Sequence, residues 1–252
     1  MIYSIQNASI WKRLSAWLLD FIVLVILATG FAFLTSLITN FDRHDEELKA
    51  AIAPYEEEYG FQYDMSTSEY EQLSEEDKLR CQEMFEKLDQ DQNVKYYYNL
   101  VINLIMVITS VAIFLSSMIT EYVVPLILKN GQTLGKKVFA IGVVKINAVK
   151  ITNLQLFVRS FLGKTAIELM VPSLLLVLIG IGHGTPLIVI LLFGLGIFQI
   201  LLFIINRHHQ VIHDVLAYTV VVDMQTQMIF ESEEELLEYK KKNHSDEVNN
   251  KL

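Results

Sequence analysis

Four long apolar stretches constrain this chain more than any other feature of its sequence. They run from Leu14 to Thr39, Asn99 to Leu128, Thr165 to Gly182 and Thr185 to Asn206. A helix that crosses a bilayer needs about 20 largely apolar residues, and each stretch reaches or approaches that length. Buried helices of a soluble protein are disfavoured, because too little amphipathic sequence remains to cover four of them. The sequence predicts a membrane α-helical protein with four transmembrane helices in a lipid bilayer.

Composition narrows the class of protein further. The net charge of −9 argues against nucleic acid as a partner. Cys81 is the only cysteine, which excludes a disulfide within the chain and a cysteine-based zinc site. The first apolar stretch is longer than the h-region of a signal peptide and contains Asp20, so it is predicted to be a retained span.

The distribution of charge predicts the orientation in the cell membrane. The segment 129–164 has seven basic and no acidic residues, which favours the cytoplasmic side. Both termini are then cytoplasmic. The predicted organisation is the N-terminus with span one (1–40), an acidic extracytoplasmic insertion (41–98), span two (99–128), a basic cytoplasmic segment (129–164), spans three and four (165–206) and a cytoplasmic tail (207–252). Only His183 and Gly184 separate spans three and four, which indicates a tight helical hairpin.

The insertion 41–98 has 17 acidic and 6 basic residues and is rich in helix-forming residue types. Ser74 is a start signal for a helix over Glu75–Asp91, which could run straight into span two. Few apolar residues are available for its core: Leu73, Leu79, Met84, Phe85 and Leu88. Two interpretations stay open, a solvated helical cap or a surface that packs against an envelope protein or a second copy.

Two cytoplasmic segments are rich in β-branched residues and too short to span the membrane. Val138–Ile146 and Tyr218–Val222 are predicted to pair as a small β-ribbon. Between them, Asn153–Lys164 has the pattern of an amphipathic helix lying at the membrane interface.

Two short motifs invite chemical interpretations. Residues 131–137 (Gly-Gln-Thr-Leu-Gly-Lys-Lys) resemble a P-loop but have the wrong glycine spacing and no Ser or Thr after the lysine. Gly131 and Gly135 are more simply explained by a sharp turn. The cluster of His208, His209, His213 and Asp214 has no second ligand set nearby, so we expect interfacial polar residues and no metal or cofactor.

Asp20 is the most informative polar residue in the spans. A carboxylate near mid-membrane costs about 2.5–3.5 kcal/mol on insertion scales, so Asp20 should face the interior of the bundle and needs a partner or a proton. Arg13 lies on the same helical stripe but about 10 Å away along the axis, too far for a direct bridge. Glu168 lies near the inner surface and is expected among lipid headgroups.

Three motifs together resemble the RDD family of bacterial membrane proteins, which is named for an arginine and two aspartates. The matching motifs are Arg13-Leu14-Ser15-Ala16 with Asp20, Gly131 to Lys137 through Gly142-Val143-Val144 with Arg159, and His213-Asp214-Val215-Leu216-Ala217 before Thr219-Val220-Val221. The resemblance implies that Arg13, Asp20 and Asp214 are the family's charged residues. The insertion is longer than the family's usual connection, and Tyr218 replaces a commonly seen glycine.

Two functions follow from these residues, and neither is enzymatic, because no nucleophile–base pair is evident. The first is transport of ions or small solutes, with proton coupling as one option, along a polar path of Asp20, Asn103, Glu121 and Gln199. Four spans make a small bundle, so transport would favour a homo-oligomer. The second is a non-catalytic scaffold that binds a partner through the insertion.

Three expectations follow from these interpretations. Asp20→Asn should abolish flux in a transporter and leave flux unchanged in a scaffold. Arg13 should pair with Asp214 at the inner face, so that exchanging the two charges restores some expression. Cys81 should react with a membrane-impermeant thiol reagent on intact cells if the insertion is outside.

Overall fold

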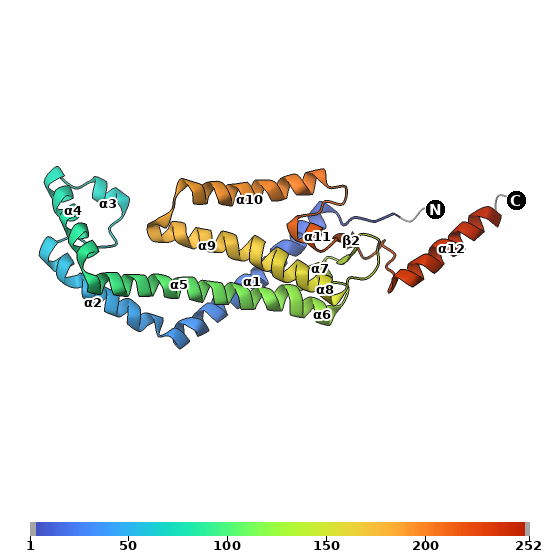
Figure 1. Cartoon of the computed structure of the whole chain (residues 1–252), viewed down its shortest axis with the longest axis horizontal. Coiled ribbons are helices and arrows are strands. Elements are labelled where there is room, and N and C mark those ends of the chain that lie inside the picture. Colours follow the sequence, from blue (N-terminus) through green and yellow to red (C-terminus); the bar gives the residue numbers. More distant parts are fainter. Residues whose placement is uncertain (1–3, 250–252) are drawn as a thin grey trace. The chain divides into compact units, whose positions relative to one another are not determined.

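Four long apolar helices dominate the computed structural model, which describes residues 4–249 and side chains as far as residue 242 (Figure 1). The four candidate spans are Ile10–Thr39, Gln92–Leu128, Asn153–His183 and Pro186–Ile205. The predicted membrane α-helical fold with four spans is therefore confirmed. The fourth span has no buried side chain, which fits broad contact with lipid.

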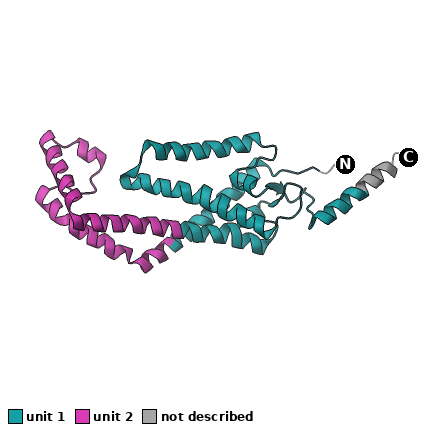
Figure 2. Cartoon of the chain, viewed as in Figure 1, with its two compact units in different colours: residues 1–31, 112–252 teal, residues 32–111 magenta. Residues whose placement is uncertain are grey.

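The chain divides into two compact units, coloured separately in Figure 2. Unit 1 comprises residues 1–31 and 112–252, and unit 2 comprises residues 32–111. Helix α1 (Ile10–Thr39) and helix α5 (Gln92–Met118) each belong partly to both units.

Unit 2 contains the acidic insertion and has its own hydrophobic core. Its helices are α2 (Phe41–Tyr59), α3 (Thr67–Glu71) and α4 (Glu75–Gln90), followed by the first part of α5. The side chain of Ser74 accepts a hydrogen bond from the backbone of Asp77, which confirms the predicted helix start. The buried core consists of Leu48, Ile52, Tyr59, Met84, Leu88, Val94 and Val101.

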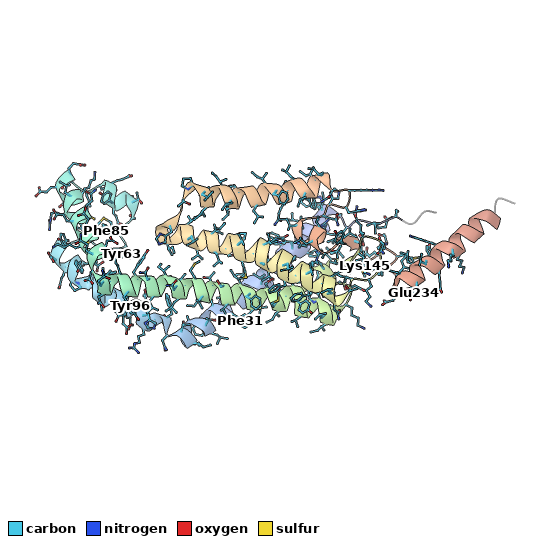
Figure 3. All side chains as sticks on the ribbon, viewed as in Figure 1. Phe31, Tyr63, Phe85, Tyr96, Lys145 and Glu234 are labelled. Carbon is cyan, nitrogen blue, oxygen red and sulfur yellow. The ribbon has the colours of Figure 1, made fainter. Side chains whose placement is uncertain are left out.

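Two expectations about the insertion are wrong. Leu79 is exposed, and Phe85 lies at the edge of the core beside Tyr63, with ring centroids 5.9 Å apart (Figure 3). Helix α4 does not run straight into span two, because Asp91 has extended backbone angles. The Asp91 carboxylate accepts hydrogen bonds from the backbone N–H groups of Asn93 and Val94, at 2.7 and 3.3 Å, and so begins a new helix.

Unit 1 contains the predicted β-ribbon. Strand β1 (Ile141–Lys145) pairs with β2 (Thr219–Asp223) in antiparallel register, with Val143 opposite Val221. The strand begins three residues later than expected, because residues before it form the short helix α7 (Leu134–Val138). Tyr218 precedes β2 at a φ of +53°, a conformation in which glycine is least strained.

The predicted interfacial helix is not separate from span three. Segment α8 (Asn153–Phe157) continues through the π-helical η2 (Val158–Met170), α9 (Val171–Leu178) and π-helical η3 (Ile179–His183). Arg159 and Ser160 are buried within this helix, so these two polar side chains do not face an aqueous surface. Gly182 then takes a φ of +82°, and Thr185 caps α10 (Pro186–Ile205), which confirms the tight hairpin.

Spans two and three each contain a π-helical segment with a buried charged residue, Glu121 in η1 (Ile119–Val123) and Arg159 in η2. Segment η1 links α5 to α6 (Val124–Leu128), and Pro125 lies four residues after Glu121. Proline lacks an N–H, so the carbonyl oxygen of Glu121 loses its usual helical partner. The hydroxyl of Ser160 donates to this oxygen at 2.5 Å instead, which joins span two to span three.

Candidate functional site

Asp214 lies at the centre of a buried ion-pair cluster in unit 1. It belongs to the short helix α11 (Ile212–Leu216), and its side chain is fully buried. Nη2 of Arg13 lies 3.4 Å from its Oδ2, so the predicted pairing is present. The closer partner is Arg159, which donates through Nη1 to Oδ1 of Asp214 and to the hydroxyl of Thr219 at 2.7 Å. Sequence reasoning placed Arg159 in a motif but missed its contact with Asp214.

This shared carboxylate overturns the expectation for the charge exchange. An arginine placed at position 214 would lie beside Arg159, and two buried cations in contact are strongly unfavourable. The combined change of Arg13→Asp and Asp214→Arg should therefore not restore expression. The pairing of Arg13 with Asp214 stands on its geometry, not on that rescue.

Asp20 is buried in unit 1 and has found its partner outside the four spans. Its carboxylate accepts hydrogen bonds from the hydroxyl of Thr133 and, at 2.7 Å, from the backbone N–H of Gly135. Thr133 in turn caps helix α7. Asp20 therefore fixes the loop after span two to the N-terminal half of α1, through neutral donors and not through a cation.

The two glycines of the 131–137 motif have different structural roles. Gly131 has a φ of +58°, which suits the predicted sharp turn. Gly135 has ordinary helical geometry, and its role is close approach. A Cβ atom at Gly135 would lie 2.1 Å from the backbone oxygen of Ala16, so the turn interpretation is wrong for Gly135. Residue patterns alone could not distinguish these two uses of glycine.

Glu121 joins spans two and three. The ammonium group of Lys164 donates to its Oε1 at 2.5 Å, and both side chains are almost fully buried. One turn of helix away, the hydroxyls of Ser117 and Thr165 lie 2.6 Å apart. Both pairs tie span two to the π-helical part of span three.

Glu168 does not lie among headgroups, as the sequence suggested. Both of its carboxylate oxygens lie 2.8 Å from Nδ1 of His213, and it also accepts from the backbone N–H of His213 at 3.2 Å. Burial and the surrounding cations, Arg159 first, hold the pKa of His213 well below its usual range, so the ring is neutral at neutral pH and donates to Glu168. Gly163 permits this contact, because a Cβ there would lie 2.4 Å from the Cβ of His213.

A cavity of about 570 Å³ lies among these groups. Its charged and polar lining comes from all four spans, from α7 and from α11: Arg13, Asp20, Glu121, Lys136, Arg159, Lys164, Glu168, Gln199 and His213. Of the predicted polar path, Asp20, Glu121 and Gln199 line the cavity. Asn103 does not; it belongs to unit 2 and its side chain is exposed.

The histidines do not converge on a common point. His208 contacts Asn7 at 3.2 Å, and His209 contacts the backbone oxygen of Phe203 at 3.0 Å. Within the described residues, no group of three His, Cys, Asp or Glu side chains could hold a metal ion.

The residues of the site coincide with a known family pattern. The sequence model of the RDD family matches residues 7–218, which include Arg13, Asp20 and Asp214. No curated protein and no solved structure matches the chain. The match covers most of the chain, and the chain therefore belongs to the RDD family.

Proposed function

We propose that this protein moves an ion or a small solute across the cell membrane through the cavity, without catalysing a covalent reaction. One observation carries the proposal: side chains from all four spans surround one charged cavity. Charged groups inside spans are costly to bury and often mark a transport path. The large lipid-facing area of span four leaves room for a second copy, so a homo-oligomer is part of the proposal.

The structure changes which substitution tests this proposal best. Asp20→Asn would disturb the contact with Thr133 as well as remove a carboxylate, so loss of flux in that variant has two explanations. Gln199 lines the cavity, and its side chain makes no hydrogen bond to another side chain or backbone group among the described residues. It therefore offers a cleaner change.

Gln199→Leu should reduce flux at least about tenfold in proteoliposomes, because it replaces a polar wall group that a hydrated solute would contact, worth about 1.4 kcal/mol or more at the barrier. Asn103→Leu is the matched control, since Asn103 lies outside the cavity, and it should transport like the wild type. A panel of cations, anions and pH gradients should be tested. Equal flux in both variants would exclude the cavity as the path.

We also propose that the insertion is extracytoplasmic and both termini are cytoplasmic. Labelling of Cys81 cannot test this orientation. Cys81 is completely buried in the core of unit 2, and burial raises the pKa of its thiol, so it should not react in the folded protein. A better reporter is Asp89→Cys in a Cys81→Ala background, because the Asp89 side chain is 80% exposed.

The Asp89→Cys protein should react with a membrane-impermeant maleimide on intact cells or protoplasts, because we place the insertion outside. Glu238→Cys in the same background is the control; it lies on an exposed position of helix α12 (Glu233–Asn249), which we place in the cytoplasm. It should react only after the membrane is opened. The reverse pattern would invert the topology.

A second candidate function is a non-catalytic scaffold that binds an envelope protein through the insertion. It is supported by the separate hydrophobic core of unit 2 and by the excess of 17 acidic over 6 basic residues in segment 41–98. Such a surface suits a basic partner. Absence of flux in the wild type across the whole panel would favour this candidate.

A further inference from the structure

The carboxylates that line the cavity already have hydrogen-bond donors. Asp20 accepts from Thr133 and Gly135, and Glu121 accepts from Lys164. Glu168 accepts from His213. The acidic groups of the cavity therefore have little need of a bound cation.

Two cationic side chains of the cavity are less well satisfied. Lys136 is only 7% exposed, and its ammonium group has no ion pair among the described residues. Nη1 of Arg13 is buried and has no hydrogen-bond acceptor within the described chain. Its Nη2 makes only the 3.4 Å contact with Asp214, and the guanidinium group lies 5.1 Å from the ring centroid of Phe203. A buried cation without a full set of acceptors is costly, so Lys136 and the free donor of Arg13 favour an anion in this part of the cavity.

The rest of the wall is apolar. Leu14, Trp17, Phe21 and Leu24 line the cavity from one face of α1, at intervals of three or four residues. Phe203 of α10 faces the same space. A cavity of about 570 Å³ with a few charged groups and apolar walls is suited to an organic molecule and is larger than an inorganic ion requires.

We propose that the cavity binds an organic anion, with its phosphate or carboxylate group at Arg13 and Lys136 and its apolar part against α1. The anion would accept hydrogen bonds from Lys136 and from the free donors of Arg13, a geometry that guanidinium and ammonium groups favour. This inference rests on the proposed function only in naming the class of solute. Its test measures binding, whereas the flux assay measures movement, so the two can fail separately.

The chain carries a convenient reporter of occupancy. It has two tryptophans, and Trp17 lines the cavity. In a Trp11→Phe protein in phosphatidylcholine nanodiscs, brominated phosphatidic acid should quench Trp17 at an about tenfold lower mole fraction than brominated phosphatidylcholine, the effect of one charged hydrogen bond. Octyl phosphate, a water-soluble organic anion, should displace the brominated lipid.

Lys136→Met should remove this preference, because it deletes the unpaired ammonium group and disturbs no ion pair. Lys137→Met is the matched control: Lys137 is the exposed neighbour on the same helix and does not line the cavity, so the preference should remain. Lys136→Arg should keep it. Equal quenching by the two lipids, or an unchanged preference in Lys136→Met, overturns the proposal. If inorganic phosphate displaces the brominated lipid as effectively as octyl phosphate does, the proposed contact of an apolar part with α1 is wrong, and the cavity is a site for a free ion.

The pH dependence supplies an independent readout. Burial, and then the positive charge of Lys164, lower the pKa of Lys136 to about 7; Arg159 also lowers it, whereas Glu121 and Asp20 act in the opposite direction. A bound anion favours the protonated amine, so binding takes up a proton and should weaken as the pH rises through 7. Lys136→Met should lose this part of the pH dependence and retain only that of the phosphate group. An identical pH profile in the two proteins contradicts the role of Lys136.

Discussion

Arg159→Ala should destabilise the folded protein by about 3–5 kcal/mol, because it leaves the carboxylate of Asp214 buried without its closest cation. The Asp214 side chain is fully buried, and Arg159 is itself only 3% exposed, so water cannot replace the lost partner. Arg13 would remain, but its contact with Asp214 is long, at 3.4 Å. The free energy of unfolding in mixed micelles measures this loss.

Lys150→Ala is the matched control for this experiment. Lys150 also pairs with a carboxylate, Glu231, at 2.7 Å, but both side chains are partly or largely exposed. An exposed ion pair contributes about 0–1 kcal/mol, so this variant should unfold nearly like the wild type. If the loss of stability comes from the direct contact between the two side chains, Arg159→Ala combined with Asp214→Ala should lower the free energy of unfolding by less than the sum of the two single changes. Strict additivity would argue against a direct coupling.

Gly135→Ala should be nearly as damaging, at about 3 kcal/mol. The added Cβ would lie 2.1 Å from the backbone oxygen of Ala16 and 3.0 Å from Cγ of Asp20, and the backbone of α1 cannot rotate away as a side chain could. Overpacking of this kind typically costs about 1–3 kcal/mol. The same displacement would pull the Gly135 N–H away from Asp20, which adds a buried, unsatisfied carboxylate.

Gly194→Ala provides the control, because a Cβ there meets nothing within 4 Å. It lies inside α10, where alanine has the higher helix propensity, so the variant should be neutral or slightly stabilised. Expression and unfolding midpoints of the two variants should be compared in the same detergent. Equal stability of Gly135→Ala and the wild type would mean that α7 does not approach α1 as closely as described.

Much of the fold follows from patterns that lie within short stretches of sequence. The four apolar runs predicted four spans, because the length of an apolar helix is set by the thickness of the bilayer. The two β-branched segments predicted the β1–β2 ribbon, and Ser74 predicted the start of α4. The errors lie where local signals compete: Leu134–Val138 forms a helix before the strand, and Asn153–Lys164 continues into span three.

The charged residues of the family motifs show more clearly what a local sequence pattern can predict. Arg13, Asp20 and Asp214 could be identified as important from motifs, and Arg13 could be matched to Asp214 because the charge pattern predicts both at the same end of the spans. The sequence could not say that Asp20 is held by Thr133 and Gly135, since these residues lie more than 110 positions away along the chain. It also gave no sign that Glu168 would meet His213.

The sequence by itself therefore determined the number of spans, the hairpin and the family. These properties depend on apolar run length and on residue spacing, which are local. Only the tertiary structure decided which donor meets which carboxylate, which glycine allows close approach, and which cations remain without a partner. Those outcomes depend on side chains from the four spans, α7 and α11 meeting in one place, and on the cavity of about 570 Å³ that their packing leaves open.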